Sequence, residues 1–117
     1  MEQLRPCIGR SERDIHKAVV DYWRSFGLPG TLVATIPNVP AFGQYGLTKG
    51  LFDLLAIAPG LPVGFIELKR DGGRPSPEQL SFQEILNGCG VKNAITYGRD
   101  EPIRVLEAWN VVRRATV

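Results

Sequence analysis

Residues 49–69 read KGLFDLLAIAPGLPVGFIELK and contain two short apolar runs separated by turn-forming residues. The runs cover residues 51–58 and 63–69, and each has the length and the apolar, partly β-branched composition of a β-strand. The Pro and Gly residues between them favour a tight antiparallel connection. We therefore expect a β-hairpin at the centre of the fold.

Three charged residues lie in this hairpin, namely Asp53, Glu67 and Lys69. A carboxylate in a sheet is stable there only if it is paired or binds a cation. Side chains two residues apart in a strand share a face, so Glu67 and Lys69 emerge side by side. If residues 59–61 form the turn, Asp53 lies opposite Glu67, with about 5 Å between their Cβ atoms. A two- or four-residue turn without a bulge would instead direct Asp53 away from Glu67.

Two carboxylates at that spacing form a hard-oxygen site suited to Mg²⁺ or Mn²⁺. The adjacent ammonium of Lys69 could orient a water molecule and offset negative charge that develops on a phosphate. This pattern indicates a phosphodiester hydrolase. A structural ion pair at a strand edge, without a catalytic role, would give the same three residues.

The rest of the sequence predicts helices and strands around the hairpin. Ser11 and Ser76 are expected N-caps of helices, and Pro77 occupies the first helical position after Ser76. Hydrophobic periodicity predicts the following elements in chain order: a helix over 11–26, a strand over 31–36, the hairpin, a helix over 77–88, a strand over 92–97 and a helix over 102–112. The order αβββαβ plus a C-terminal helix predicts an α/β fold with a mixed four-stranded sheet flanked by helices.

The composition predicts one globular domain over residues 1–117. Hydrophobic residues make up 44% and charged residues 22%, and the net charge is +2. Cys7 and Cys89 have no paired spacing, and His16 is the single histidine, so neither a disulfide framework nor a zinc site is expected. No apolar run approaches the roughly 18 residues of a membrane span, and the first residues lack a signal-peptide pattern. We therefore expect a cytoplasmic protein.

The joint spacing of three segments resembles a known family. These segments are K-G-L-F-D-L-L-A-I, G-F-I-E-L-K and G-R-P-S-P-E-Q-L-S-F-Q-E-I-L-N-G-C-G, with Pro37-Asn38 upstream. Together they resemble the VRR-NUC (virus-type replication-repair nuclease) domain of the PD-(D/E)XK nuclease superfamily, over about residues 11–98. One departure is Phe52, which stands where the family usually has Pro before the Asp.

The resemblance implies a Mg²⁺- or Mn²⁺-dependent endonuclease that cuts DNA, such as a flap or a four-way junction, in replication, recombination or repair. It implies a metal held by Asp53 and Glu67 with the Leu68 backbone carbonyl, and it implies Lys69 as the catalytic lysine. Gln79, or Gln83, would reach the site from the following helix. The alternatives are a non-catalytic DNA-binding module and an RNA-directed nuclease.

Two further residues have two interpretations each. Glu12 lies on the helical face of Ile15 and Val19, so its carboxylate would point toward the sheet as a further metal ligand and catalytic acid. An acidic residue in a first helical turn is also favoured by the helix dipole alone. Gln79 is either a catalytic residue or the capping-box partner of Ser76, and the two roles are compatible.

Several residues are candidates for nucleic-acid contacts because they are basic, aromatic or amide side chains around the hairpin. They are Asn38, Gln44, Tyr45, Lys49, Arg70, Arg74 and Gln83. The segment 37–49 is long for a connection in so small a domain, and its apolar residues would equally suit packing on a second subunit. We expect a homodimer, because one chain offers one metal centre and a symmetric DNA branch needs two.

Overall fold

The computed structural model describes residues 11–37 and 48–115, and its elements follow the expected order. In chain order they are α1 (Glu12–Phe26), β1 (Leu32–Thr35), β2 (Leu54–Ala58), β3 (Leu61–Lys69), α2 (Pro77–Gly88), β4 (Lys92–Tyr97) and α3 (Asp100–Ala108). Both expected N-caps are present, since Ser11 Oγ accepts a hydrogen bond from Asp14 N and Ser76 Oγ accepts one from Gln79 N.

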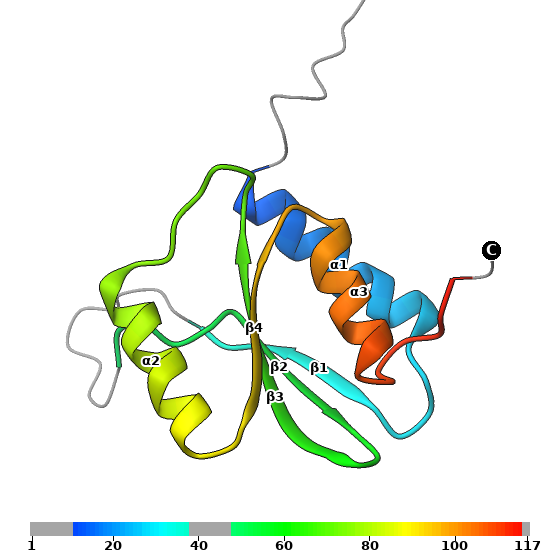
Figure 1. Ribbon diagram of the computed structural model, residues 1–117. Helices are drawn as coiled ribbons and strands as arrows, with labels where there is room; N and C mark the ends of the chain where they lie inside the picture. The colour runs from blue at the N-terminus through cyan, green and yellow to red at the C-terminus, as the bar shows by residue number, and fades with distance from the viewer. Residues whose placement is uncertain (1–10, 38–47, 116–117) are drawn as a thin grey trace, which may run out of the picture.

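The strands form one mixed sheet in the order β1-β2-β3-β4. The pairs β1/β2 and β2/β3 are antiparallel, whereas β3 and β4 are parallel. Helices α1 and α3 lie side by side on one face of the sheet and α2 lies on the other (Figure 1). The predicted α/β fold, a mixed four-stranded sheet flanked by helices, is therefore confirmed.

The main apolar core lies between the sheet and the pair α1 and α3. Ile15 and Val19 of α1 and Leu106 of α3 are buried there with Leu54 of β2 and Ile66 of β3. Each of these side chains contributes roughly 1.5–3 kcal/mol by its removal from water. This packing leaves the opposite face of β3 to α2 and to the charged residues of the hairpin.

The hairpin turn differs from the expected one. Pro59 and Gly60 alone connect the strands, because Ala58 pairs with Leu61 and Gly60 has φ +80°, in the left-handed region that favours glycine. A β-bulge follows at once: Ala56 pairs with Gly64, so two residues of β3 face one residue of β2. Pro62 lies in the bulge, where its missing N–H is tolerated. Beyond the bulge the register equals that of a regular three-residue turn.

Helix α3 ends at Ala108, so the expected extension to residue 112 is wrong. Asn110 adopts φ 60°, and Val111 N donates to Leu106 O at 2.8 Å while Asn110 N donates to Glu107 O at 3.0 Å. These two bonds form a Schellman motif, which ends the helix. Val111 and Val112 are nevertheless buried, because the chain turns back and Val112 bridges to Gly27.

No helix in residues 11–37 and 48–115 combines the length and the hydrophobicity needed to cross a bilayer.

Candidate active site

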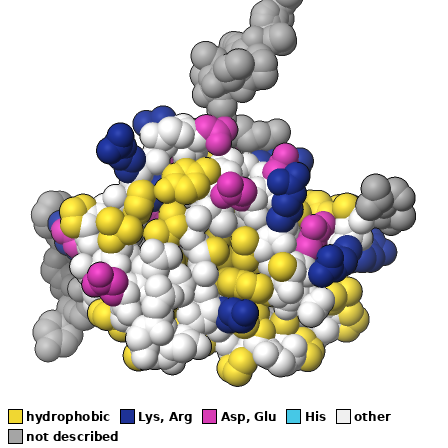
Figure 2. Space-filling view, in the orientation of Figure 1, with side chains coloured by type: hydrophobic (Ala, Val, Ile, Leu, Met, Phe, Trp, Pro, Cys, Tyr) yellow, Lys and Arg dark blue, Asp and Glu magenta, His cyan; other side chains and the backbone are white. Residues whose placement is uncertain are grey.

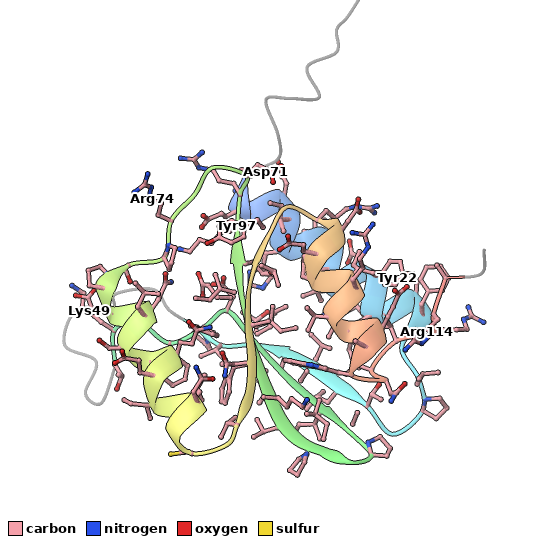
Figure 3. The ribbon with its side chains drawn as sticks, in the orientation of Figure 1. Tyr22, Lys49, Asp71, Arg74, Tyr97 and Arg114 are labelled. Atoms are coloured by element: carbon pink, nitrogen blue, oxygen red, sulfur yellow. The ribbon has the colours of Figure 1, made fainter. Side chains whose placement is uncertain are left out.

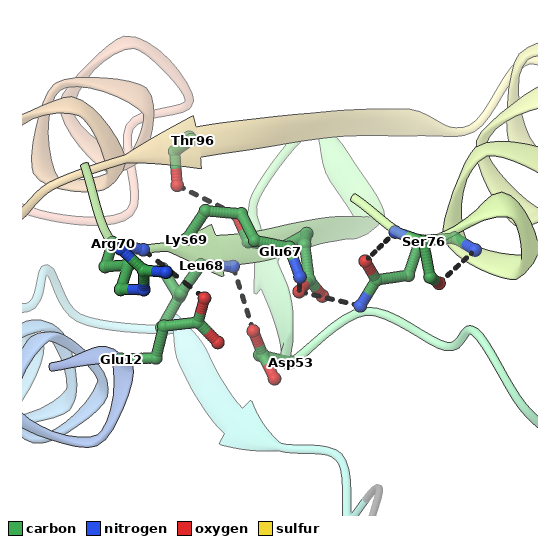
Figure 4. Close-up of polar contacts among 9 residues, drawn as sticks. Glu12, Asp53, Glu67, Leu68, Lys69, Arg70, Ser76 and Thr96 are labelled. Carbon is green, nitrogen blue, oxygen red and sulfur yellow. Dashed lines mark hydrogen bonds and ion pairs between the residues drawn. The ribbon is translucent and has the colours of Figure 1, made fainter. Parts of the chain in front are cut away.

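Asp53 lies directly before β2, opposite the end of β3. The pairing of Leu54 with Ile66 places Asp53 across from Glu67, the facing expected from a three-residue turn and reached here by a two-residue turn with a bulge. Asp53 Oδ2 accepts a hydrogen bond from the backbone N–H of Leu68 at 2.9 Å (Figure 4). The Asp53 carboxylate is therefore fixed beside Glu67 by the backbone of the opposite strand.

Glu67 is the most constrained acid of the site, with 2% of its surface exposed. Its Oε2 accepts a hydrogen bond from Gln79 Nε2 at 2.8 Å and lies 3.2 Å from Lys69 Nζ. Its Oε1 is buried and has no hydrogen-bond partner among the described residues. The pKa of Glu67 is raised to about 8, first by burial of the carboxyl group and second by the charge of Asp53, while Lys69 acts in the opposite direction. The Oε1 atom of Glu67 is therefore buried without a partner among the described residues, although a buried polar atom normally has one.

Strand β4 holds the end of β3 in place. Thr96 is buried, and its Oγ1 donates to the backbone oxygen of Glu67 at 2.9 Å (Figure 4). Two residues further along each strand, Gly98 N donates to Lys69 O at 2.9 Å. The backbone that carries both charged side chains is thus hydrogen-bonded on the β4 side.

Gln79 is the expected capping-box partner of Ser76, and it also contacts the acid Glu67. Gln79 Oε1 accepts from Ser76 N at 2.9 Å, which completes the capping box of α2, and Gln79 Nε2 donates to Glu67 Oε2. The amide is bifunctional, so one end caps the helix while the other end holds the acid. The first turn of α2 and the carboxylate of Glu67 are therefore parts of one hydrogen-bond network.

Phe52, the departure from the family pattern, is a buried anchor for α2. It is fully buried, and its ring packs edge-to-face on Phe82 of α2 with 5.2 Å between centroids. Phe65 of β3 also packs on Phe82, with 5.5 Å between centroids. Such aromatic pairs contribute roughly 0.5–1.5 kcal/mol each beyond their burial. Phe52 thus helps to place Gln79 next to Glu67, a role that its position in the sequence did not indicate.

Glu12 approaches from the first turn of α1 and is exposed. Its Oε2 accepts from Arg70 N at a long distance of 3.4 Å (Figure 4). Among the described residues, no group of three or more His, Cys, Asp or Glu side chains is close enough together to hold a metal ion. The structure therefore brings together Asp53, Glu67, Lys69 and Gln79 and leaves Glu12 beside the start of the next loop.

The nucleic-acid candidates fall into three groups. Asn38, Gln44 and Tyr45 lie outside the described residues. Lys49, Arg70 and Arg74 are exposed, and Figure 3 shows Lys49 and Arg74 on the side of the molecule that carries α2. Gln83 instead ties α2 to β4, because its Nε2 donates to Asn93 Oδ1 at 3.1 Å.

The donor set of this site fits a divalent cation. Asp53 and Glu67 present carboxylate oxygens to the same region, and the buried Oε1 of Glu67 is available as a ligand. Hard oxygen donors of this kind are those that Mg²⁺ and Mn²⁺ prefer. A bound cation would also offset the two causes that raise the pKa of Glu67, its burial and its repulsion by Asp53.

Comparison with known proteins agrees with this architecture. No family model matches the sequence, and no curated protein matches it. Among solved structures, a VRR_NUC domain matches with a TM-score of 0.60 at 21% identity, over 86% of this chain and 99% of the other. The chain therefore has the fold of a VRR_NUC domain, a nuclease-type fold, as its resemblance in sequence predicted.

We expect Glu67→Gln to raise the unfolding temperature of the metal-free protein in EDTA at pH 8. In the unfolded chain this carboxyl ionises near its ordinary pKa of 4.5, but in the folded chain its pKa is about 8. The folded state therefore loses stability as the pH rises between these two values, and Gln removes that loss, which is on the order of 1–3 kcal/mol after allowance for screening. Thermal unfolding followed by circular dichroism measures the difference.

Two comparisons control this experiment. The exposed Glu84→Gln variant should unfold with the wild type, and the gain from Glu67→Gln should shrink at pH 5. Added Mg²⁺ should stabilise the wild type and not Glu67→Gln, because only a folded-state ligand shifts the unfolding equilibrium. An unchanged or lower unfolding temperature for Glu67→Gln in EDTA at pH 8 would contradict the raised pKa of this carboxyl group.

Proposed function

We propose that this protein is a Mg²⁺- or Mn²⁺-dependent endonuclease that hydrolyses DNA phosphodiester bonds. The observation that carries the proposal is the pair of facing acids Asp53 and Glu67, with the ammonium of Lys69 beside them. The buried Oε1 of Glu67, which has no partner in the described part of the chain, adds to it. A module that only binds DNA has no need to hold two acids beside a phosphate. The nuclease-type fold supports the same class of reaction.

Each residue has a distinct role in this proposal. Asp53, Glu67 and the Leu68 backbone carbonyl would hold the cation, and when bound it would supply Lewis-acid polarisation of the scissile phosphate and acidification of the attacking water. Lys69 orients that water and offsets charge on the phosphate oxygens. Gln79 fixes the rotamer of Glu67 through its hydrogen bond. Glu12, beside Arg70, is proposed as a further acid of the site.

The proposed substrate is DNA with a branch, such as a flap or a four-way junction, during replication, recombination or repair in the cytoplasm of a bacterium or a phage host. Lys49, Arg70 and Arg74 would contact backbone phosphates around the site, as would Asn38, Gln44 and Tyr45. In the view of Figure 2, basic and acidic side chains are intermixed across the surface. Affinity should therefore depend on a few local contacts rather than on one broad basic face.

One assay tests the proposal directly. Purified protein is incubated with labelled linear, flap and four-way DNA and with a matched RNA duplex, each in Mg²⁺, Mn²⁺ or EDTA. We expect cuts in branched DNA that require the metal. Cleavage of RNA in preference to DNA would change the substrate class, and binding without cleavage of any substrate would overturn the enzyme in favour of a binding module.

We also propose that the active form is a homodimer. Symmetric resolution of a branch needs two metal centres, and a C2 pair is the commonest way to provide them. Leu80 and Ile85 of α2 are 46% and 62% exposed and offer an apolar surface to a second copy. Light scattering should give twice the chain mass of 12.9 kDa. A constant mass of one chain, with full activity on the best substrate, would reject the dimer.

A further inference from the structure

Tyr97, the last residue of β4, lies next to Lys69 on the sheet. The parallel register pairs Lys69 with Tyr97 and Glu67 with Ile95. Residues paired in this way project from the same face of a sheet, and neighbouring strands are about 4.8 Å apart. The Tyr97 ring therefore projects from the face that carries Glu67 and Lys69, one strand further from Asp53.

The backbone of Tyr97 is held firmly, whereas its hydroxyl is not engaged. Tyr97 N donates to Glu101 Oε1 at 2.9 Å, and the next amide, Gly98 N, donates to Lys69 O. The side chain is half-buried, and among the described residues its hydroxyl has no hydrogen-bond partner and its ring has no aromatic partner. A half-buried tyrosine usually gives its hydroxyl a partner. The Tyr97 hydroxyl is therefore a half-buried polar group without a partner in residues 11–37 and 48–115, on a residue whose backbone is hydrogen-bonded.

The segment after β3 brings positive charge to the same end of the sheet. A Cβ on Gly98 would lie 3.2 Å from Asp71 Oδ1, so this segment passes close to the end of β4. Figure 3 shows Tyr97 below Asp71, at the end of the sheet from which the chain continues to Arg74. Lys69, Arg70 and Arg74 bring three cations of the kind that a phosphate backbone attracts to this end of the sheet, which also carries the acids Asp71 and Glu101.

We infer that Tyr97 binds the substrate, with its hydroxyl donating a hydrogen bond to a backbone phosphate oxygen next to the scissile phosphate. This inference rests on the proposed nuclease function and adds a residue on β4 that no sequence motif marks. Tyr97 lies beyond Lys69, one strand away from Glu67 and two from Asp53, so it acts in holding DNA rather than in the bond-breaking step.

Tyr97→Phe tests this role because it keeps the ring and removes only the hydroxyl. Loss of a hydrogen bond to a charged acceptor should raise KM for a labelled flap duplex about tenfold, with kcat within about twofold of the wild type. Fluorescence anisotropy should give the same rise in Kd for that duplex. Since the phenol is neutral, the rise should be equal at every salt concentration, so the slope of log Kd against log salt stays unchanged.

Tyr22→Phe is the matched control, because Tyr22 lies on α1 and its ring packs on Phe26, on the other side of the sheet. It should leave KM, kcat and Kd unchanged. A Tyr97→Phe protein with wild-type KM and Kd would overturn the inference while leaving the nuclease in place, as would a fall in kcat alone. If the wild type neither binds nor cuts DNA, the proposed function is wrong, and the role inferred for Tyr97 is wrong with it.

Discussion

Asp53→Asn is expected to abolish DNA cleavage while the protein stays folded. Removal of one carboxylate from a two-acid site takes away several kcal/mol of transition-state stabilisation, a fall of about 10³-fold or more in turnover. The fold should persist, because the side-chain oxygen of Asn can still accept the hydrogen bond that Asp53 Oδ2 receives from Leu68 N. Gel assays of flap cleavage in Mg²⁺, together with thermal unfolding, measure both parts.

The control for this experiment is Asp21→Asn. Asp21 pairs with Lys17 on the surface of α1, so the variant removes an acid of the same type outside the site. It should cut DNA at the wild-type rate. Undiminished cutting by Asp53→Asn, or cutting by the wild type in excess EDTA, would refute the metal-dependent mechanism.

Lys69→Met is expected to lower turnover about 100-fold with little change in DNA affinity. Lys69 Nζ lies 3.2 Å from Glu67 Oε2, so its charge would act on a phosphate bound at the proposed site. Loss of one preorganised donor of this kind costs roughly 10²–10³ in kcat, whereas one phosphate contact is a small part of binding. Met keeps the length of the buried chain, and Lys69→Ala should have a similar effect on turnover.

Separate measurement of kcat and Kd decides the role of this lysine. Lys92→Ala, an exposed lysine at the opposite end of β4, is the control and should match the wild type in turnover. Equal losses in binding and cleavage on Lys69→Met would make Lys69 a DNA-binding residue. Wild-type turnover of Lys69→Met would show that Lys69 has no role in the cleavage reaction.

The hydrophobic pattern predicted the helices and strands of this fold because the apolar stripes are mostly buried against the sheet or against a helix, as their spacing indicates. Ile15 and Val19, for example, recur with helical spacing and are buried against the sheet as expected. The ends of the elements depended on backbone conformations that the pattern does not encode. The left-handed Asn110 ends α3 four residues earlier than the apolar pattern predicts.

The candidate site was predicted in part. Features that follow from neighbouring residues in the sequence could be predicted, whereas features that depend on contacts between distant segments could not. The facing of Asp53 and Glu67 follows from strand alternation once the register is known, so it could be derived. Phe52 and Tyr97 depend on contacts with α2 and on the register of β4, and no spacing rule relates them to the acids.

The β-bulge in the hairpin lengthens the stretch of sequence between the two acids by one residue without changing their pairing. Five steps lead from Asp53 to Ala58 and six lead from Leu61 to Glu67, and the bulge absorbs the difference. A chain without Pro62 would form an unbroken ladder from the same turn and would still bring the same two acids face to face. Bulged and regular hairpins therefore give the same pairing at different linear intervals. A search that demands one fixed interval would overlook proteins with this chemistry.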